Sequence, residues 1–240
     1  MKLLDTSNSN HKIKKSQLSR DAVRIASLSL YPDDELCPSR HNADCAEACI
    51  IGAGCGAMGN VITGRQNKTD FYHADRAAFI AQLKRELINF WKLCIKDNVR
   101  GYVRLNTFSD IQWERVENGS IPQSFPELNF YDYTKLASRL DRVPDNYKLM
   151  FSYSDAPKYR NQVRRALKSD RPISAVFNGP MPTRFLDRPV INGDDSDLNN
   201  LEHIGHVVGL KFKQNRIAPI DPNKSHLIIT TDRSYTHATI

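Results

Sequence analysis

Residues 147–178 read YKLMFSYSDAPKYRNQVRRALKSDRPISAVFN, and this stretch decides the class of fold that the chain can adopt. An apolar run at 147–155 precedes a polar segment that Pro157 is well placed to open as a helix, and the apolar run 173–178 follows. A strand, a helix and a second strand of these lengths form a β/α unit, whose two strands lie parallel in one sheet.

Further strands are predicted on both sides of this unit. Apolar runs that contain β-branched or aromatic residues place them at 20–30, 101–110, 128–135 and 206–213. The most regular helix begins at Thr69 or Asp70 and runs to about Asp97, with apolar residues along one side. We therefore expect an α/β fold whose parallel β/α units form a partial or distorted TIM-like barrel, with an open sheet as the alternative. A cysteine-rich loop would follow the first strand.

Composition indicates a folded protein and suggests its kind of partner. With 240 residues, 40% hydrophobic and 25% charged, the chain falls outside the disordered and membrane-embedded classes. We divide it into a flexible N-terminal segment (1–19), a β/α domain (20–213) with a cysteine loop at 37–55, and a C-terminal extension (214–240). Because no apolar run approaches the ~20 residues of a membrane span, we expect no membrane partner and a cytoplasmic location. The net charge of +7 favours an anionic partner, either a small molecule or nucleic acid.

Four of the five cysteines fall close together in the sequence. They are Cys37, Cys45, Cys49 and Cys55, with the spacing C-x7-C-x3-C-x5-C. Zinc sites usually pair their cysteines at short spacing, whereas thiolates at irregular spacing suit an iron–sulfur cluster. The pattern favours an iron–sulfur cluster over a zinc site and over ordinary buried or redox-active thiols. The fifth cysteine, Cys94, lies in the apolar stripe of the long helix and is predicted to pack in the core.

The sequence of the loop indicates how the ligands would be arranged and leaves the role of Cys55 open. A helical turn over 44–51 would place Cys45 and Cys49 on one face, and the glycines from Gly52 to Gly59 would allow close approach of a bulky group. Cys55 is either a fourth ligand that closes the site or a bystander that leaves one iron open.

Polar residues repeatedly follow the predicted strands, where the loops of a parallel sheet converge. After successive strands they are Asn106, Ser109 and Asp110, then Tyr133 and Lys135, then Ser152 and Ser154, then Asn178. These residues predict a site at the carboxyl ends of the strands. The alternative is that they are ordinary polar turn residues.

Two resemblances rest on these motifs. A strand, a three-cysteine loop and repeated β/α units resemble the radical S-adenosylmethionine superfamily, although the usual C-x3-C-x2-C spacing is missing. More specifically, the chain looks like the bacteriophage gene product 88 family over residues 20–213. The matching segments are Cys37-Pro38, Cys45 and Cys49, then Arg104-Leu105-Asn106, Ser109-Asp110, Tyr133-Thr134-Lys135, Ser152-Tyr153-Ser154, and Gly193-Asp194 with Asp197. Ile50 stands where an aromatic residue is expected.

The resemblances imply a site and a location. Cys37, Cys45 and Cys49, with Cys55 as a further candidate, would hold a [4Fe-4S] cluster, and S-adenosylmethionine would bind its open iron. The implied catalytic residues are Asn106, Asp110, Lys135 and Ser154, and the implied cofactor-binding residues are Arg104, Tyr133 and Ser152. The reaction would be reductive chemistry on a small molecule or nucleotide, in the cytoplasm of the infected bacterial host.

A second hypothesis comes from the basic residues. Five cations lie within residues 158–168, namely Lys158, Arg160, Arg164, Arg165 and Lys168, and the N-terminal region adds Lys12, Lys14 and Lys15. Such a face is able to follow a nucleic-acid backbone, although a basic run is also typical of a solvated helix face. On this hypothesis the chain is a nucleic-acid-binding phage regulatory protein with a structural iron–sulfur or zinc site.

Overall fold

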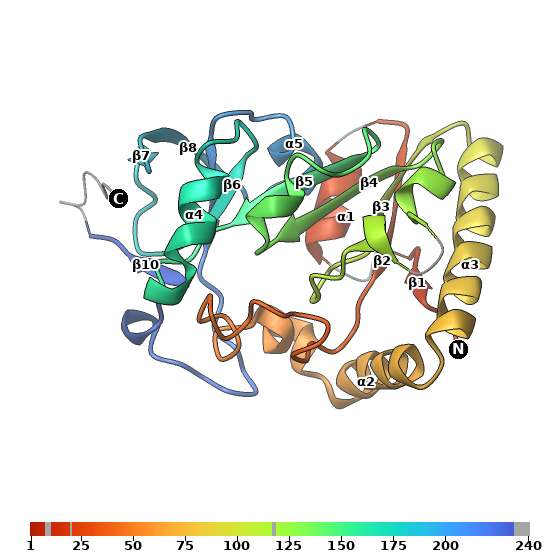
Figure 1. Ribbon diagram of the computed structural model, residues 1–240, viewed down its shortest axis with the longest axis horizontal. Helices are drawn as coiled ribbons and strands as arrows, with labels where there is room; N and C mark the ends of the chain where they lie inside the picture. The colour runs from red at the N-terminus through yellow and green to blue at the C-terminus, as the bar shows by residue number, and fades with distance from the viewer. Residues whose placement is uncertain (8–10, 20, 117–118, 233–240) are drawn as a thin grey trace. The chain divides into compact units, whose positions relative to one another are not determined.

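The protein has a mixed α/β fold. The computed structural model describes residues 1–7, 11–19, 21–116 and 119–232, and over these residues a large sheet of mostly parallel strands does not close into a barrel (Figure 1). The chain forms two compact units. The first unit contains Met1–Cys37, Met58–Asp132 and Val143–Lys148, and the second contains Pro38–Ala57, Tyr133–Arg142 and Leu149–Ile240.

The first unit contains the strands from β1 to β4, except the last two residues of β4, which belong to the second unit. β1 (Leu4–Asp5) pairs antiparallel with β2 (Val23–Leu28), β2 pairs parallel with β3 (Arg100–Arg104), and β3 pairs parallel with the start of β4 (Asn129–Thr134). Five of the six residues of β2 are buried, as expected for a parallel strand whose two faces are both covered. β2 leads directly into the segment that carries the first cysteine.

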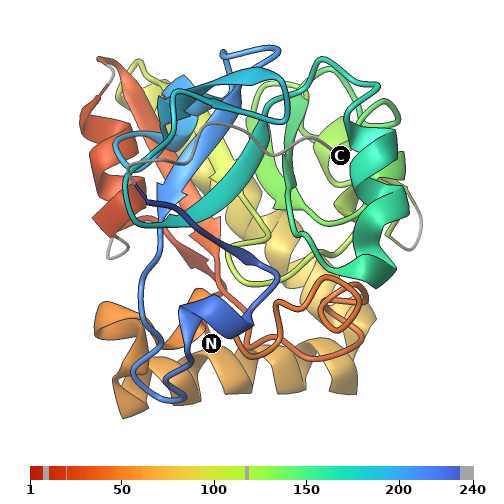
Figure 2. The same ribbon diagram turned by 90° about the vertical axis from the view of Figure 1, so that its left-hand side faces the viewer.

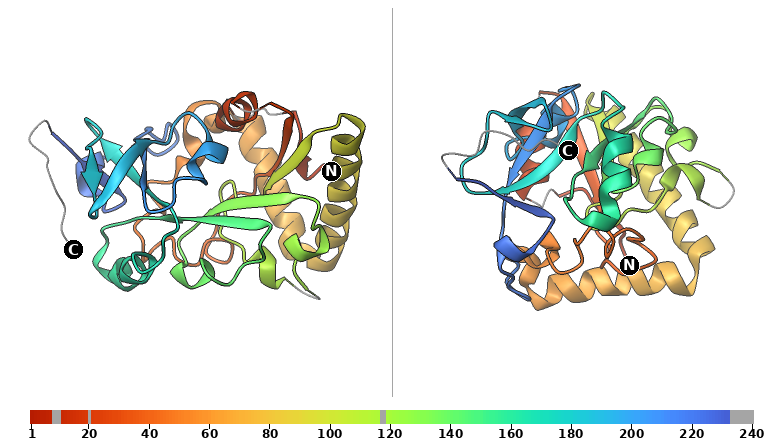
Figure 3. Two further views of the ribbon diagram at one scale, coloured as in Figure 1. Left: turned by 90° about the horizontal axis from the view of Figure 1, so that it is seen from above. Right: turned by 60° about the vertical axis from the view of Figure 1, so that its left-hand side comes forward.

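Three helices belong to this unit: α1 (His11–Leu18), α2 (Gly59–Ala74) and α3 (Arg76–Lys96). α2 and α3 meet at a corner, which is visible in Figures 1 and 3. Asp75 makes this corner, since it ends α2 and its carboxylate accepts a hydrogen bond from the Ala78 N–H at 2.9 Å, which caps α3. The single helix predicted from Thr69 or Asp70 to Asp97 was therefore wrong at its start. Thr69 is a buried residue inside α2.

The second unit contains the other strands. They are β5 (Tyr147–Ser152, whose first two residues belong to the first unit), β6 (Ile173–Asn178), β7 (Arg184–Phe185), β8 (Arg188–Asn192), β9 (Val207–Lys211) and β10 (Ile228–Thr230). Their order is β5-β6-β9-β8-β7, and all neighbours are parallel except β7 and β8. β10 pairs parallel with the last residues of β6. Two short helices, α4 (Arg160–Ala166) and α5 (Asp197–Asn200), complete the unit.

Seven single turns of 3-10 helix lie within the described residues. They are η1 (Ile50–Gly52), η2 (Gly54–Ala57), η3 (Trp113–Arg115), η4 (Pro122–Ser124), η5 (Ala137–Arg139), η6 (Pro157–Tyr159) and η7 (Pro222–Lys224). η6 continues into α4, so Pro157 opens this helix as predicted.

The α/β class and the parallel strands are confirmed, whereas the TIM-like barrel is not. Two pairs of strands are antiparallel, β1 with β2 in the first unit and β7 with β8 in the second. Within 1–19, which we expected to be flexible, Leu3, Leu4 and Ile13 are buried. Within 214–232, Asn215 is buried and β10 pairs with β6. The remaining residues of the predicted extension, 233–240, lie outside the described residues.

The core of the first unit tolerates no side chain at Gly101 in β3. A Cβ atom there would lie 2.5 Å from the Leu128 side chain and 3.0 Å from the Cys94 sulfur, and both neighbours are buried. Cys94 thus packs in the core, as predicted.

We therefore expect Gly101→Ala to lower the free energy of unfolding by about 1–3 kcal/mol, because overpacked cores shift at this cost. Urea titration measures the change. Gly64→Ala in α2 is the matched control, since its Cβ meets nothing within 4 Å, and its stability should stay equal or rise by up to about 1 kcal/mol. If Gly101→Ala were as stable as Gly64→Ala, the core would have adjusted around the added methyl group at no cost, and the prediction would be wrong.

Candidate functional site

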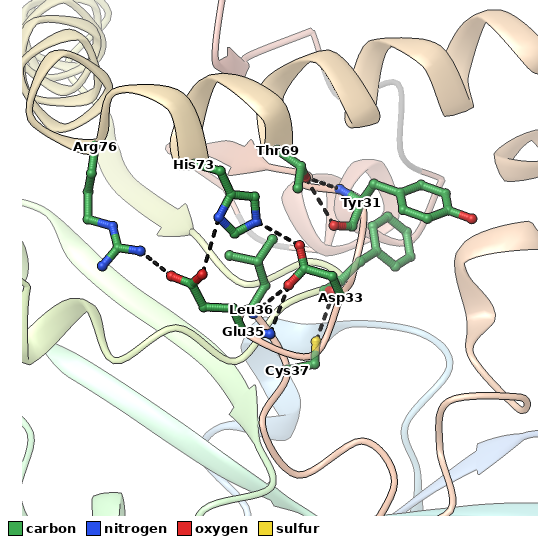
Figure 4. A network of polar contacts seen from close by, with 9 residues as sticks. Tyr31, Asp33, Glu35, Leu36, Cys37, Thr69, His73 and Arg76 are labelled. Carbon is green, nitrogen blue, oxygen red and sulfur yellow. Dashed lines mark hydrogen bonds and ion pairs between the residues drawn. The ribbon is translucent and has the colours of Figure 1, made fainter.

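In the first unit, Cys37 lies at the end of a segment that is fastened to α2 (Figure 4). The Tyr31 N–H donates to the Thr69 hydroxyl at 2.8 Å, and this hydroxyl donates back to the Tyr31 carbonyl at 3.0 Å. Farther along, the Cys37 N–H donates to the Asp33 carbonyl at 3.0 Å, and the Cys37 thiol donates to the Phe108 carbonyl at 3.4 Å. Cys37 is therefore held once through its backbone N–H and once through its thiol.

The Asp33 carboxylate organises this segment. Its Oδ1 accepts hydrogen bonds from the Glu35 N–H at 3.0 Å and the Leu36 N–H at 2.8 Å, and its Oδ2 lies 2.7 Å from Nε2 of His73. Burial acts to raise the pKa of Asp33, but the hydrogen bonds from Leu36 and His73 outweigh it, so the pKa lies below the usual value of 3.8. Asp33 is a carboxylate at neutral pH.

His73 joins two carboxylates of this segment to α2. Its Nδ1 lies 3.3 Å from Oε2 of Glu35, and Glu35 also pairs with Arg76 (Figure 4). Both ring nitrogens of a histidine are donors only when the ring is protonated. An imidazolium at His73 would thus bind Asp33 and Glu35 together.

A second turn of the first unit gathers the predicted residues that follow β3. The Asn106 side-chain oxygen accepts from the Ser109 hydroxyl, the Ile111 N–H and the Trp113 indole N–H at 2.8–3.1 Å, and its amide nitrogen donates to the Ile111 carbonyl at 2.9 Å. The Asp110 N–H donates to the Leu36 carbonyl at 2.7 Å. Asn106, Ser109 and Asp110 are all buried, and the turn that they form is tied to the segment carrying Cys37.

Arg104, the last residue of β3, is half-buried, and the chain enters this turn directly after it. The Asn106 N–H donates to Oδ1 of the buried Asp132 at 2.7 Å, and Oδ2 of Asp132 accepts from the Tyr147 hydroxyl at 2.8 Å. Asp132 and Tyr147 were not predicted as part of the site. The carboxylate of Asp132 fixes the turn at the carboxyl end of β3.

The second unit contains the segment with Cys45, Cys49 and Cys55, and this segment packs against residues 215–226 (Figure 2). The Asp44 carboxylate accepts from the His226 N–H at 2.8 Å, the Cys49 carbonyl accepts from the Asn215 side-chain amide at 3.1 Å, and the Gly52 carbonyl accepts from the Arg216 N–H at 3.0 Å. Three anchors along the segment therefore fix its backbone.

The helical turn predicted over 44–51 was wrong. Cys45 lies in an irregular loop, where its N–H donates to the Arg40 carbonyl at 2.8 Å, and regular hydrogen bonding begins only at η1. Asp44 has a left-handed backbone with φ of 50°, which a helix does not accept. The atoms close to Gly52 belong to the protein itself, since a Cβ there would lie 2.0 Å from Oδ1 of Asn215, so the expected approach of a bulky bound group to the glycines stays a prediction.

His226 links the cysteine segment to the carboxyl end of β5. Its carbonyl accepts from the Ser154 hydroxyl at 3.3 Å and from the Asp155 N–H at 2.8 Å, while its N–H is held by Asp44. Ser154 is fully buried. Within this unit, the structure thus brings Ser154 and the residue before Cys45 into one hydrogen-bonded chain.

Lys135 and Ser152 also meet at the end of β5. The Lys135 ammonium donates to the carbonyls of Ser152 and Tyr153, both at 3.1 Å, and lies 5.4 Å from the centre of the Tyr159 ring. The Tyr159 hydroxyl donates to the Lys135 carbonyl at 2.7 Å. Lys135 therefore carries its charge at the carboxyl end of a strand, where its three donors suit backbone oxygens.

Tyr133 makes a separate contact within the second unit. Its hydroxyl donates to Oδ1 of Asp197 at 2.8 Å, and Asp197 is a buried carboxylate at the start of α5. Sequence reasoning included Asp197 only in a family motif and did not identify Asn215, His226, Tyr159, Asp33 or His73 as parts of the site. These residues are single polar positions far from the cysteines along the chain, so no local spacing marks them.

The five cysteines are thiols and differ in exposure. Cys55 is exposed, Cys37, Cys45 and Cys49 are half-buried, and Cys94 is buried. Across the part of the chain that the structure describes, no group of three or more His, Cys, Asp or Glu residues is arranged to hold a metal ion. None of the described helices is both long enough and apolar enough to cross a membrane.

Fold and site together define an α/β protein with polar residues at the carboxyl ends of parallel strands and a cysteine segment whose backbone is held by hydrogen bonds. The family model described as Gene product 88 matches residues 2–227, and the chain belongs to this bacteriophage protein family. Comparisons with curated proteins and with solved structures found no match. The family expected from the sequence is thereby confirmed, whereas the resemblance to the radical S-adenosylmethionine superfamily receives no support from these comparisons.

The Asp33 carboxylate should contribute stability that depends on pH. We expect Asp33→Ala to lower the free energy of unfolding by about 1 kcal/mol at pH 7, the usual cost of a lost capping side chain. Since the pKa of Asp33 is depressed in the folded state, this contribution is present above the usual value of 3.8 and is lost as pH falls through the lower folded-state value.

Urea titrations of wild type and variant between pH 7 and pH 2.5 measure this difference. Asp70→Ala, which removes an exposed carboxylate from α2, serves as the control and should change stability little at any pH. A difference for Asp33→Ala that grows as pH falls would contradict the assigned hydrogen bonds.

Thiol reactivity should follow the environments of the cysteines. Burial raises the pKa of Cys94 to about 11, so almost none of it is thiolate at pH 8. We expect iodoacetamide at pH 8 to modify the exposed Cys55 first and to leave Cys94 unmodified in the folded protein. Mass spectrometry of tryptic peptides follows the reaction over time, and modification of Cys94 as fast as Cys55 would show that the core opens.

Proposed function

We propose that the chain is an iron–sulfur protein in which Cys37, Cys45 and Cys49 hold a [4Fe-4S] cluster. The observation that carries the proposal is the concentration of four thiols in one short stretch whose backbone is fastened by hydrogen bonds around each proposed ligand. A loop with no such task would have little reason to gather cysteines, since structural disulfides are rare in reducing compartments.

The chemistry of the donors suits this group, although among the described residues no three such side chains are already arranged around a metal position. Iron–sulfur clusters are held by cysteine thiolates, and the three proposed ligands are half-buried, which limits access of water to an oxygen-sensitive group. Hydrogen bonds already restrain the backbone of each ligand: Cys37 through Asp33, Cys45 through Arg40, and Cys49 through Asn215. Cys55 is exposed in η2, so we assign it no ligand role. Three ligands would leave one iron with an open coordination position.

An open iron is the basis of a finer proposal, that the protein is a radical-SAM-like protein. On this proposal its sheet corresponds to part of a TIM-like barrel. Such a cluster, when bound, supplies one electron for the reductive cleavage of S-adenosylmethionine. Residues of this chain would bind and orient the reactants. We assign Arg104 and Lys135 to a carboxylate or phosphate, because both are cations at carboxyl ends of strands.

The remaining polar residues divide between contact and positioning. Ser152, half-buried at the end of β5, and Tyr133 are proposed to contact the cofactor, and Asp110 to hold an amine. Asn106 and Ser154 already make hydrogen bonds inside the protein, so we assign them to positioning: Asn106 holds the turn with Asp110, and Ser154 holds His226. A cluster of this kind requires a reducing compartment, and the cytoplasm of the infected host would provide it.

Anaerobic preparation with iron and sulfide analysis tests the cluster. We expect about four irons per chain and a broad visible absorption, because thiolate-to-iron charge transfer colours such clusters. Cys45→Ala and Cys49→Ala should lose most of the iron, since each removes a ligand. Cys55→Ala is the matched control and should keep it.

Two outcomes would contradict the assignment. Stoichiometric zinc with no visible absorption would replace the iron–sulfur cluster by a zinc site. Loss of iron in Cys55→Ala, equal to that in Cys49→Ala, would replace the open cluster by a closed one with four thiolates, and the finer proposal would then fail while the iron–sulfur assignment stood.

A further inference from the structure

We infer that α4, together with the turns on either side of it, forms a binding surface for the phosphate backbone of double-stranded DNA. Its five cations are Lys158, Arg160, Arg164, Arg165 and Lys168, and all five are exposed. Residues 156–169 contain no acidic residue, so this short stretch carries five positive charges in a chain whose net charge is +7. The surface is called the α4 basic face below.

The charges of the α4 basic face are not neutralised by neighbours. Within the described part of the chain, none of the five side chains makes an ion pair or a side-chain hydrogen bond. The nearest acidic residues along the chain are Asp155 and Asp170, which flank the stretch at its two ends. Most exposed charges on proteins are interspersed with opposite ones, so an uncompensated group of this size favours an anionic ligand.

The opposite side of the same helix is fixed to the second unit. Tyr159, Val163 and Ala166 are at most 2% exposed, so the helix presents its cations on the side away from the core. Gln162 accepts a hydrogen bond from the Ala137 N–H at 2.9 Å. The cations therefore project from a rigid support rather than from a mobile tail.

Arg188 holds the end of this helix. Its guanidinium donates to the carbonyls of Leu167 at the C-cap and of Ser169 and Arg171 in the turn that follows, at 2.7–3.1 Å. Burial lowers the pKa of Arg188, but an arginine stays protonated at neutral pH. A sixth cation thus lies at the base of the α4 basic face.

The composition of the surface selects the kind of nucleic acid. The solvent-facing residues of α4 are Arg160, Asn161, Arg164 and Arg165, and no aromatic residue is among them. Proteins that bind single strands stack bases on exposed aromatic rings, whereas contacts to duplex DNA go mainly to phosphates. Arginine pairs well with phosphate, and Arg160 to Arg165 span about 7.5 Å along the helix, beside several charges of a duplex. Binding should therefore be independent of base sequence.

Fluorescence anisotropy with a labelled 30-base-pair duplex tests the inference. Four to five phosphate contacts predict a slope of about −4 for log K against log salt, and hence about a 250-fold loss of affinity between 50 and 200 mM salt. The variant Arg160→Gln/Arg164→Gln/Arg165→Gln removes three contacts, so its slope should fall to about −1. Circular dichroism confirms that the variant is folded.

The matched control removes the same charge from another exposed helix face. Arg85, Lys92 and Lys96 lie along one side of α3, and Arg85→Gln/Lys92→Gln/Lys96→Gln should keep the wild-type slope. Equal weakening of both triple variants would show a net-charge effect and would overturn the inference. So would binding to vesicles with anionic lipids without binding to the duplex, or tighter binding of a single strand than of the duplex. Iron content has no part in this test, so the result is independent of the proposed cluster.

Discussion

The segment that carries Cys37 is held in place by one partly buried carboxylate, that of Asp33. It accepts two backbone N–H groups of its own turn and faces His73 of α2, while the carbonyl of the same residue accepts the Cys37 N–H. Each hydrogen bond of this kind makes a net contribution of about 1 kcal/mol to the free energy of unfolding, and more when one partner is charged. The position of the first cysteine in the unit depends on this turn.

The second unit uses the same principle with a different residue. Asn215 donates to the Cys49 carbonyl, and its side-chain oxygen accepts from the N–H groups of Ile217 and Ala218. A buried amide that satisfies three backbone groups is costly to remove, because each group would lose its partner. Gly52 is required beside it, since any Cβ would occupy the space of Oδ1 of Asn215. Polar side chains, rather than regular secondary structure, define the path of the cysteines.

The sequence predicted the parallel strands well and the site only in part. β6 was predicted with its observed bounds because ISAVFN is a short, mostly apolar run, and Cys94 was placed in the core by helical spacing. α2 was missed because its residues show weak amphipathic periodicity, and β8 because Pro189 and polar residues interrupt it. The contacts of Asp33 with His73 and of Cys49 with Asn215 join residues 40 and 166 positions apart. Local patterns carry no information on such pairs.

The central claim is that Cys37, Cys45 and Cys49 are ligands of an iron–sulfur cluster. A crystal structure of anaerobically prepared protein, with anomalous diffraction recorded at the iron and zinc absorption edges, tests it most directly. The account predicts a compact iron peak in contact with the three sulfurs, with Cys55 outside the coordination sphere. A peak at the zinc edge alone, or sulfurs with no metal density between them in fully reduced protein, would contradict it.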